Sequence, residues 1–434
     1  MDRDESSEGR VHRFGRPDRL VRTVAIAVVL GVLAGVFTVG FLRTLESLKD
    51  WLWTDLPNEL NVDSTSWTWI VPVVAVGATL LGLARRFLGE YPVSLEQAIE
   101  EHHANGAFDY RHVWQAAVIS LVSLGFGAAL GPEAALMAIL GGLGSWIARV
   151  IETDESERVG LPYVGIAAAL GAVFTTAGAA VLVLSPRSSE AEDVRAGRIW
   201  WLLPAGAAAG AGMFVYQWLG TSGQYFDLGV PDYNLAVTDV AWAVPVAVAG
   251  AALAFLFLAA QRLGDRLLLP LNGRHVLQSL LGGAVLAGLA SWSTLVLFSG
   301  HQGTDRIIAD FGSDDASFLV LVAVAKVVAA AALLSAYWKG GRFFPLMFAG
   351  AAIGLAAALR VDGVDEVVGV AAGMTGAVGV LLRRPVPTVL FMIWFFPLAA
   401  WPIVVVAAVV GGLAGKHFGA IIEDEPASGQ RLVS

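Results

Sequence analysis

The sequence predicts an all-α membrane protein that crosses the bilayer many times, and three observations support this. Hydrophobic residues make up 56% of the 434 residues and charged residues only 15%, whereas soluble domains carry about 25% charged residues. Apolar stretches close to the roughly 20 residues that a spanning helix needs recur along the chain. The 49 glycines are typical of membrane helices that pack closely through small side chains.

The composition argues against several classes of function. Without cysteine, the chain can form no disulfide, iron–sulfur cluster or thiolate metal site. The net charge of −9 comes without a basic patch of useful size, so we expect no nucleic-acid partner. His102 and His103 lie in a polar segment, where we expect solvated side chains rather than metal ligands. No H-E-x-x-H motif occurs, so we expect neither an enzyme nor a need for a cofactor or metal.

The N-terminal tail, residues 1–22, predicts the orientation of the chain. Shortly before the first apolar stretch it carries a basic cluster of Arg10, His12, Arg13, Arg16, Arg19 and Arg22. Such clusters stay on the cytoplasmic side of a membrane. The following stretch, residues 24–42, lacks a small-residue cleavage site and therefore indicates a membrane segment rather than a signal peptide. We expect a multi-pass protein of the cell membrane with a cytoplasmic N-terminus.

The predicted membrane segments are distributed over the whole chain. In the first half they are residues 24–42, 69–83, 113–130, 134–148, 165–184 and 200–219. In the second half they are residues 241–260, 277–298, 318–334, 344–359, 367–382 and 389–410. Several are short or are interrupted by glycine and proline, which predicts many short, tilted and broken helices.

Weak internal similarity suggests that the chain contains two repeats. Residues 164–168 (VGIAA) resemble 368–372 (VGVAA), and 171–173 (GAV) match 376–378 (GAV). In each half of the chain the matching segments follow a glycine-rich break. This arrangement predicts two inverted-topology repeats that meet at a site near the middle of the membrane. The expected parts are a first repeat at residues 23–220, a connecting loop at 221–238, a second repeat at 239–422 and a polar C-terminal tail at 423–434.

Glu133 is the only charged residue between His112 and Arg149. A carboxylate in such apolar sequence costs about 2.5–3.5 kcal/mol on insertion scales, so it is kept chiefly where it has a function. It follows Gly131 and Pro132 at the expected start of a helix, where an ionised side chain would compete with a bound anion for free N–H groups. We interpret Glu133 as a pH-sensitive gate. The alternative is a residue that only stabilises its own helix dipole.

A second glycine-rich break, Gly340-Gly341-Arg342-Phe343-Phe344-Pro345, precedes another apolar segment. Glycine permits unusual backbone angles, and proline is tolerated in the first turn of a helix. The free N–H groups at such a start can hold an anion without a formal positive charge, so that the ion can also leave. The alternative is a break that serves only packing.

In this order, the two breaks resemble those of the CLC family of chloride channels and chloride/proton exchangers. Members of that family carry a G-x-E-G-P element with a gating glutamate and a G-x-F-x-P element at the anion site. Glu133 falls on the first element, and Gly341, Phe343 and Pro345 match the second. The similarity extends to residues 299–303 (SGHQG) and 324–327 (VAKV), and covers roughly residues 20–420.

The chain also departs from the family pattern at three places. Ala134 and Ala135 stand where the pattern has Gly-Pro. The family's early G-S-G-I-P element corresponds best to residues 88–92 (LGEYP), in which Gly89 takes the place of the serine. The usual pore tyrosine near the C-terminus has no counterpart, and Phe418 is the nearest match. Both replacements remove a hydroxyl group that would touch the ion.

The resemblance implies a role for each candidate residue. Glu133 is the gate, and the anion-binding residues are Gly131, Gly341, Arg342, Phe343, Phe344 and Phe418, with Pro345 and Lys326 as pore-supporting residues. Because two hydroxyls are missing, we expect binding to depend more on the backbone amides of Arg342 and Phe343. Lys326 lies in the middle of an apolar segment. It provides either a positive potential that draws anions or a structural pair with a carboxylate or with backbone carbonyls.

The resemblance further implies a homodimer in the lipid bilayer, with one pore per subunit and small anions such as chloride as the transported ligand. Proton-coupled members usually carry a second, intracellular glutamate. That position falls near residues 185–187 (SPR), and Glu190 and Glu192 come slightly later. We therefore expect a channel or a weakly coupled transporter. The alternatives left open are a fluoride/proton antiporter, a chloride/proton antiporter and a non-conducting anion-binding scaffold.

Overall fold

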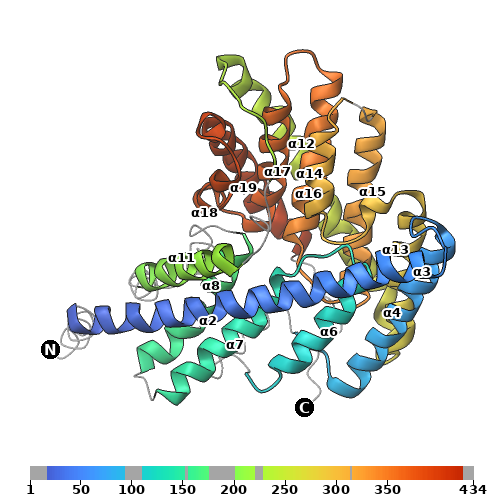
Figure 1. The fold of residues 1–434 in the computed structure, drawn as a ribbon. Coiled ribbons are helices and arrows are strands. Elements are labelled where there is room, and N and C mark those ends of the chain that lie inside the picture. The colour runs from blue at the N-terminus through green and yellow to red at the C-terminus, as the bar shows by residue number, and fades with distance from the viewer. Residues whose placement is uncertain are drawn as a thin grey trace. The chain divides into compact units, whose positions relative to one another are not determined.

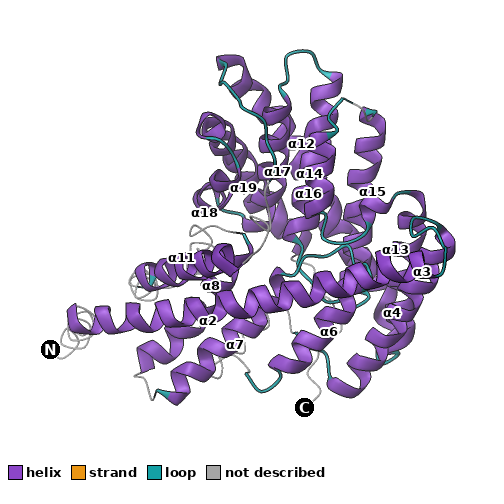
Figure 2. Ribbon diagram, in the orientation of Figure 1, coloured by secondary structure: helices purple, strands orange, loops and turns teal. Residues whose placement is uncertain are grey.

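A computed structural model of the protein describes residues 17–92, 110–151, 155–174, 201–219, 228–312 and 315–423 (Figure 1). These residues form helices joined by loops and contain no named strand, as Figure 2 shows. Eight of the helices are long and apolar enough to cross a membrane: Leu20–Glu59, Trp67–Leu88, Glu133–Val150, Val237–Leu271, His275–Trp292, Ala316–Ser335, Phe343–Arg360 and Leu398–Gly419. The predicted all-α polytopic fold is confirmed.

The chain is organised in two compact units, each assembled from separate segments. The first contains Met1–Phe41, Val93–Val113 and Leu136–Phe226, and the second contains Leu42–Pro92, Trp114–Ala135 and Asp227–Ser434. These units report packing rather than internal repetition, so the two expected repeats stay a prediction. Both glycine-rich breaks belong to the second unit.

The first unit contains α8 (Glu155–Val173), α11 (Leu202–Leu219) and most of α2 (Pro17–Asp50) and α7 (Glu133–Val150). Helix α8 packs against α11. Small residues bring the backbones together, because a Cβ atom at Gly31 would overlap the backbone of Ala208, and one at Gly165 would overlap the carbonyl of Leu140. Such close approach is how membrane helices associate without a hydrophobic driving force.

The second unit holds the other long helices: α4 (Trp67–Leu88), α6 (Val113–Gly125), α12 (Val237–Leu268), α13 (His275–Trp292), α14 (His301–Ala309), α15 (Ala316–Ser335), α16 (Phe343–Arg360), α17 (Glu366–Leu382), α18 (Pro385–Met392) and α19 (Trp401–Glu423). Its shorter elements are η1 (Trp51–Asp55), α3 (Leu56–Glu59), η2 (Leu269–Leu271), η3 (Thr294–Val296), η4 (Ile393–Phe395) and η5 (Leu398–Ala400). Helix α17 lies at its centre and packs against α12, α16 and α19 (Figure 1). After Glu366 its sequence is apolar on all sides except for the buried Thr375, as expected of a helix that other helices surround.

Several long helices begin at a capping side chain. Ser66 accepts the N–H of Thr68 at the start of α4, and Asp365 accepts the N–H of Val367 at the start of α17. Helix α16 begins differently, because Arg342 at its N-cap position makes no side-chain hydrogen bond to the helix. The first N–H groups of α16 are thus left to another partner.

Some predicted boundaries are wrong for identifiable reasons. The single segment expected at residues 389–410 is divided among α18, η4, η5 and α19. Pro397 causes the division, because the residue before a proline is driven to extended angles, and Phe396 has φ −128° and ψ 149°. The segment expected at 113–130 ends as a helix at Gly125. The expected end of segment 165–184 lies outside the described residues.

Candidate functional site

The first break leads into α7, which starts at Glu133 itself. The Glu133 side chain is completely buried, although it is ionisable. The second break leads into α16, which starts at Phe343. Pro345 lies in the first turn of α16 and is buried, in agreement with the tolerance of helix starts for proline.

The two breaks are joined by a pair of backbone hydrogen bonds. The N–H of Gly131 donates to the carbonyl of Gly341 at 2.9 Å, and the N–H of Gly341 donates to the carbonyl of Gly131 at 2.7 Å. This is an isolated antiparallel bridge between segments that are far apart in the sequence. It holds the starts of α7 and α16 next to each other.

The Glu133 carboxylate lies between the two breaks. Its Oε1 accepts the backbone N–H of Phe343 at 2.9 Å, and the N–H groups of Glu133 and Phe344 lie close to the same carboxylate. Its Oε2 has no hydrogen-bond partner among the described residues. A Cβ atom at Gly131 or Gly341 would overlap this carboxylate, which explains why both positions are glycine.

The charged side chain that acts on Glu133 through space is Arg342. Arg342 is half-buried. Within hydrogen-bonding distance, however, the carboxylate is held by a backbone N–H rather than by a cation. The start of α16 thus has a carboxylate as the acceptor of its first backbone N–H, which is the position that an anion takes at a helix start.

Aromatic rings surround the start of α16. The Phe343 ring lies 6.0 Å from that of Phe391 on α18, and the Phe344 ring meets the His301 ring edge-on at 6.4 Å. Phe344 is buried, as is His301, whose Nδ1 lies 2.8 Å from the hydroxyl of Ser299. The contact of Phe391 with Phe343 could not be predicted from the sequence, because it joins two separate helices.

Lys326 is fully buried in α15 and binds backbone carbonyls. Its ammonium Nζ lies 2.7–3.1 Å from four consecutive carbonyl oxygens, those of Leu295, Val296, Leu297 and Phe298, which share its three N–H donors. These contacts are those expected of a structural pair with backbone carbonyls, and the proposed attraction of anions by Lys326 stays a prediction. The loop that it holds leads into α14, whose first residue is His301, and so supports the aromatic surroundings of Phe344.

Gly89 ends α4 with a left-handed backbone, at φ +96°. A side chain there would be strained, and a Cβ atom would lie 2.9 Å from the Tyr91 ring. The chain thus uses glycine at this position for a turn. Two residues of the LGEYP segment contact the chain just ahead of the second break, because the backbone carbonyls of Glu90 and Pro92 accept hydrogen bonds from the Lys339 ammonium.

Phe418 does not join the other predicted anion-binding residues in the described structure. It lies on α19, 58% exposed, and its ring meets that of Phe255 on α12 at 6.2 Å. By contrast, Gly131, Gly341, Phe343 and Phe344 are brought together around Glu133. The difference arises because α19 continues as one helix through Phe418 instead of breaking near it.

Comparisons with known proteins agree with this arrangement. The family model described as "Voltage gated chloride channel" matches residues 76–416, which is most of the chain. A relative from Escherichia coli (strain 55989 / EAEC), named "Putative ion-transport protein YfeO", is 28% identical over 370 residues, covering 82% of this chain and 84% of that protein.

Two solved structures share the fold at low sequence identity. One, of a slow cyanobacterial Cl−/H+ antiporter, has a TM-score of 0.75 at 17% identity and covers 93% of this chain and 97% of its own. The other, of a CLC-type fluoride/proton antiporter, has a TM-score of 0.76 at 18% identity and covers 92% of this chain and 97% of its own. Identities this low show the fold alone. Together with the family match over most of its length, they lead to one conclusion: this multi-pass membrane protein belongs to the voltage-gated chloride channel (CLC) family.

Proposed function

We propose that the protein carries small anions of the chloride type across the membrane, through a site at the starts of α7 and α16 that Glu133 gates. The observation that supports this most directly is the hydrogen bond from the Phe343 N–H to the fully buried Glu133 carboxylate. A carboxylate and a halide are both anions that accept such an N–H. The two therefore compete for one position.

The gate works by exchange of one anion for another. While Glu133 is ionised and turned toward Phe343, its carboxylate occupies the helix-start amide. When Glu133 takes up a proton or swings away, the amide is free for a halide. Because backbone dipoles and not a full cation hold the ion, it is bound and still able to leave. Proton uptake by Glu133 would make anion flux depend on pH.

The finer assignment is a channel or a weakly coupled transporter. It rests on the lack of a clear inner glutamate, because the expected position near residues 185–187 carries Ser-Pro-Arg and lies outside the described residues. We further propose a homodimer with its arginine-rich N-terminus on the cytoplasmic side, where such clusters remain. Residues 1–16 of that tail also lie outside the described part.

A fluoride/proton antiporter is the second candidate. The observation that favours it is Gly89, whose left-handed turn leaves no serine hydroxyl in the segment where chloride-selective relatives are expected to have one. A chloride/proton antiporter and a non-conducting anion-binding scaffold are the third and fourth candidates. The candidates differ in which ion moves and whether protons move with it.

Efflux from proteoliposomes tests the proposal. Vesicles that contain the purified protein or its Glu133→Ala variant are loaded with chloride or fluoride. Release of the halide is followed at two pH values, and proton movement is recorded. We expect chloride efflux that depends on pH in the wild type and not in the variant. Fluoride efflux coupled to protons would favour the second candidate. If neither halide leaves vesicles that contain folded protein, transport is refuted and the scaffold remains.

A further inference from the structure

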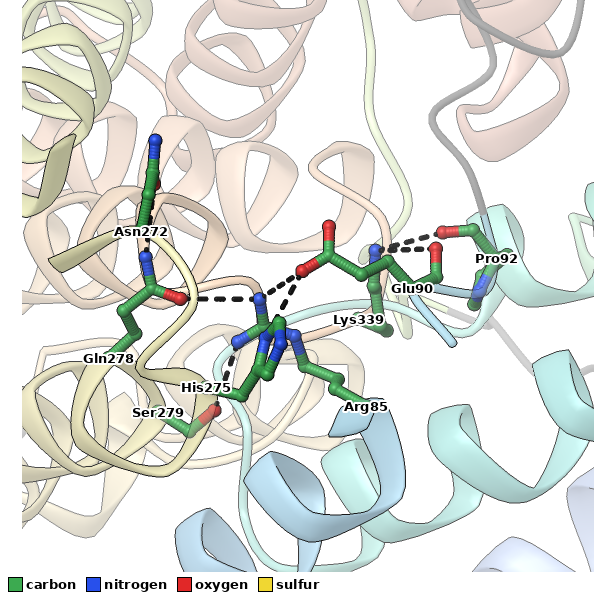
Figure 3. Close-up of polar contacts among 8 residues, drawn as sticks. All are labelled: Arg85, Glu90, Pro92, Asn272, His275, Gln278, Ser279 and Lys339. Carbon is green, nitrogen blue, oxygen red and sulfur yellow. Dashed lines mark hydrogen bonds and ion pairs between the residues drawn. The ribbon is translucent and has the colours of Figure 1, made fainter. Parts of the chain in front are cut away.

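A second charged cluster lies in the larger unit and is formed by Arg85, Glu90, His275 and Lys339 (Figure 3). We call it the Arg85 cluster. Arg85 comes from the last turn of α4, Glu90 follows that helix, His275 begins α13, and Lys339 precedes α16. Arg85 and His275 thus face the Glu90 carboxylate, and Lys339 binds the backbone of the same segment through the carbonyls of Glu90 and Pro92. The gating mechanism proposed above uses none of them.

Arg85 is the buried centre of the cluster, with 2% of its surface exposed. Its guanidinium donates to Glu90 Oε1 at 2.6 Å and, over longer distances, to Gln278 at 3.3 Å and Ser279 at 3.4 Å. It also stacks on the Tyr337 ring at 4.3 Å. Its Nε has no hydrogen-bond partner among the described residues. A buried guanidinium with a donor left over has capacity for a further anionic partner.

Glu90 is the member of the cluster that is most open to solvent. Its side chain is 45% exposed, although Oε1 is bound by Arg85 and lies 3.4 Å from His275 Nδ1. A carboxylate with this exposure can turn toward solvent and leave its donors behind. It therefore resembles the Glu133 carboxylate, which also fills an anion position, except that here the donors are side chains.

Lys339 connects the cluster to the second break. Its ammonium donates to the carbonyls of Pro92 at 3.0 Å and Glu90 at 3.4 Å, and its backbone N–H donates to the Ser123 hydroxyl at 3.0 Å. Gly341, which forms the bridge to Gly131, follows two residues later. Whatever binds in the Arg85 cluster thus acts next to the segment that enters α16.

The charges of the cluster do not balance. Arg85, His275 and Lys339 are basic side chains, whereas Glu90 is the one acidic member of the cluster. A further carboxylate, Asp265 of α12, acts on Tyr337 from the side, but the cation that acts on it is Arg262 of its own helix. A surplus of positive charge in a partly buried place attracts small anions.

We propose that the Arg85 cluster is a second small-anion site, occupied in this structure by the Glu90 carboxylate as a displaceable internal ligand. A halide takes the place of that carboxylate on the Arg85 guanidinium when Glu90 turns away, with His275 and Lys339 completing the positive surroundings. The proposal rests on the anion transport proposed above, because it adds a halide position beside the second break. The contrary interpretation is a permanent ion pair that only fastens the end of α4 to α13.

Glu90→Gln separates the two interpretations, because glutamine keeps the shape of the side chain and removes the competing charge. Sodium bromide is titrated by calorimetry into the purified full-length protein in detergent, with gluconate balancing the ionic strength. We expect the variant to bind an additional bromide that the wild type does not bind, or to bind it at a roughly tenfold lower concentration, a difference of about 1.4 kcal/mol. A permanent ion pair predicts identical titrations.

Two further variants keep the test decisive. Glu59→Gln removes an exposed carboxylate in α3 and should titrate like the wild type, whereas Lys339→Met added to Glu90→Gln should abolish the gained binding. If Glu90→Gln does not yield folded protein, Glu90→Asp replaces it, because the shorter carboxylate withdraws from Arg85. Folded Glu90 variants without any bromide gain overturn the proposal.

The same titration in a Glu133→Gln background distinguishes this site from the gate. A gain from Glu90→Gln that persists there belongs to a separate site, whereas a gain that disappears belongs to the Glu133 site and refutes the Arg85 cluster. Failure of the efflux experiment together with a persistent bromide gain would refute transport and leave the second site standing. Normal efflux without the gain in bromide binding would refute the second site and leave the transport proposal standing.

Discussion

The Glu133 carboxylate accepts the backbone N–H of Phe343 at 2.9 Å, although 210 positions of the sequence separate the two residues. Phe343 begins α16, and the residue before it supplies no capping side chain. The start of one membrane helix is thus capped by a carboxylate from another. A second anion could bind this amide only if the Glu133 carboxylate left it.

Glu133→Gln keeps the shape of the side chain and removes its charge and its titration. We expect anion efflux to become faster by roughly tenfold or more, because a hydrogen bond to a charged group contributes about 1.5–3 kcal/mol and the competing anion is gone. The efflux should also become insensitive to pH. A chloride-selective electrode outside proteoliposomes measures both effects. Efflux that still follows pH would assign the pH response to another group.

Gly341→Ala places a methyl group where it overlaps the Glu133 carboxylate. We expect a loss of stability of about 1–3 kcal/mol, typical of overpacking, and a weaker pH dependence of efflux, because the carboxylate is pushed off the Phe343 amide. Thermal melting in detergent and the efflux assay measure the two effects. The matched control is Gly288→Ala in α13, where nothing lies within 4 Å of the new atom. Similar behaviour of both variants would contradict the described position of Glu133.

Lys326→Met removes a fully buried ammonium from four backbone carbonyl oxygens. Breaking a buried charged arrangement on one side typically costs about 3–5 kcal/mol, so we expect the melting temperature to fall sharply. Lys416→Met is the matched control, because Lys416 is exposed on α19 and surface substitutions usually change stability by less than about 0.5 kcal/mol. Equal melting temperatures of the two variants would show that the carbonyl contacts contribute little.

Phe418→Ala distinguishes the role expected from the family pattern from the position that the structure describes. Phe418 is 58% exposed and contacts Phe255, so we expect efflux within roughly twofold of the wild type and a loss of about 0.5–1.5 kcal/mol from the aromatic pair. Chloride and fluoride efflux are measured side by side. A changed preference between the two halides would restore Phe418 to the anion pathway.

Lys339 lies between α15 and α16, outside the spanning helices, and burial lowers the pKa of its ammonium from 10.5 to about 8. Nearby Glu90 raises this pKa and Arg85 lowers it further. Between these two pH values the unfolded chain binds the proton more tightly than the folded protein, so the free energy of unfolding should increase as the pH rises.

Melting temperatures measured from about pH 8 upward test this, with Lys339→Met expected to remove the increase. The pKa of Tyr337 is raised above its ordinary 10.0, chiefly by burial, and acts in the opposite direction at higher pH. The comparison is therefore made below pH 10. An increase of the same size in the variant would assign it to other groups.

The sequence predicts the centre of the candidate site because isolation in apolar sequence is a local signal. Glu133 is conspicuous among uncharged neighbours, and Gly341 and Phe343 belong to one short motif. What local signals do not provide is the partner of each residue. The contacts of Lys326 with residues 295–298, and of Arg85 with Gln278 and Ser279, join segments that only the folded chain brings together.

Phe418 illustrates a different limit. Its assignment depended on register relative to a family pattern near the C-terminus, where the chain continues as a helix. Hydrophobicity indicates that such a stretch is helical but not which side faces the site, because glycine and alanine make the neighbouring turns nearly alike. The single segment predicted at residues 389–410 was wrong for another reason, since Pro397 interrupts an otherwise continuous apolar pattern.

The reciprocal bonds between Gly131 and Gly341 have a consequence for how fast the proposed gate would move. They fasten the backbone ahead of Glu133 to the backbone ahead of Phe343, so the carboxylate can leave the Phe343 amide by rotation about its side-chain bonds while the two helix starts stay together. Side-chain rotations are faster than collective helix movements by orders of magnitude. Distance labels on the two helix starts would therefore report the same spacing whether the pathway conducts or not, and the open state would differ from the closed one by little more than a single rotamer.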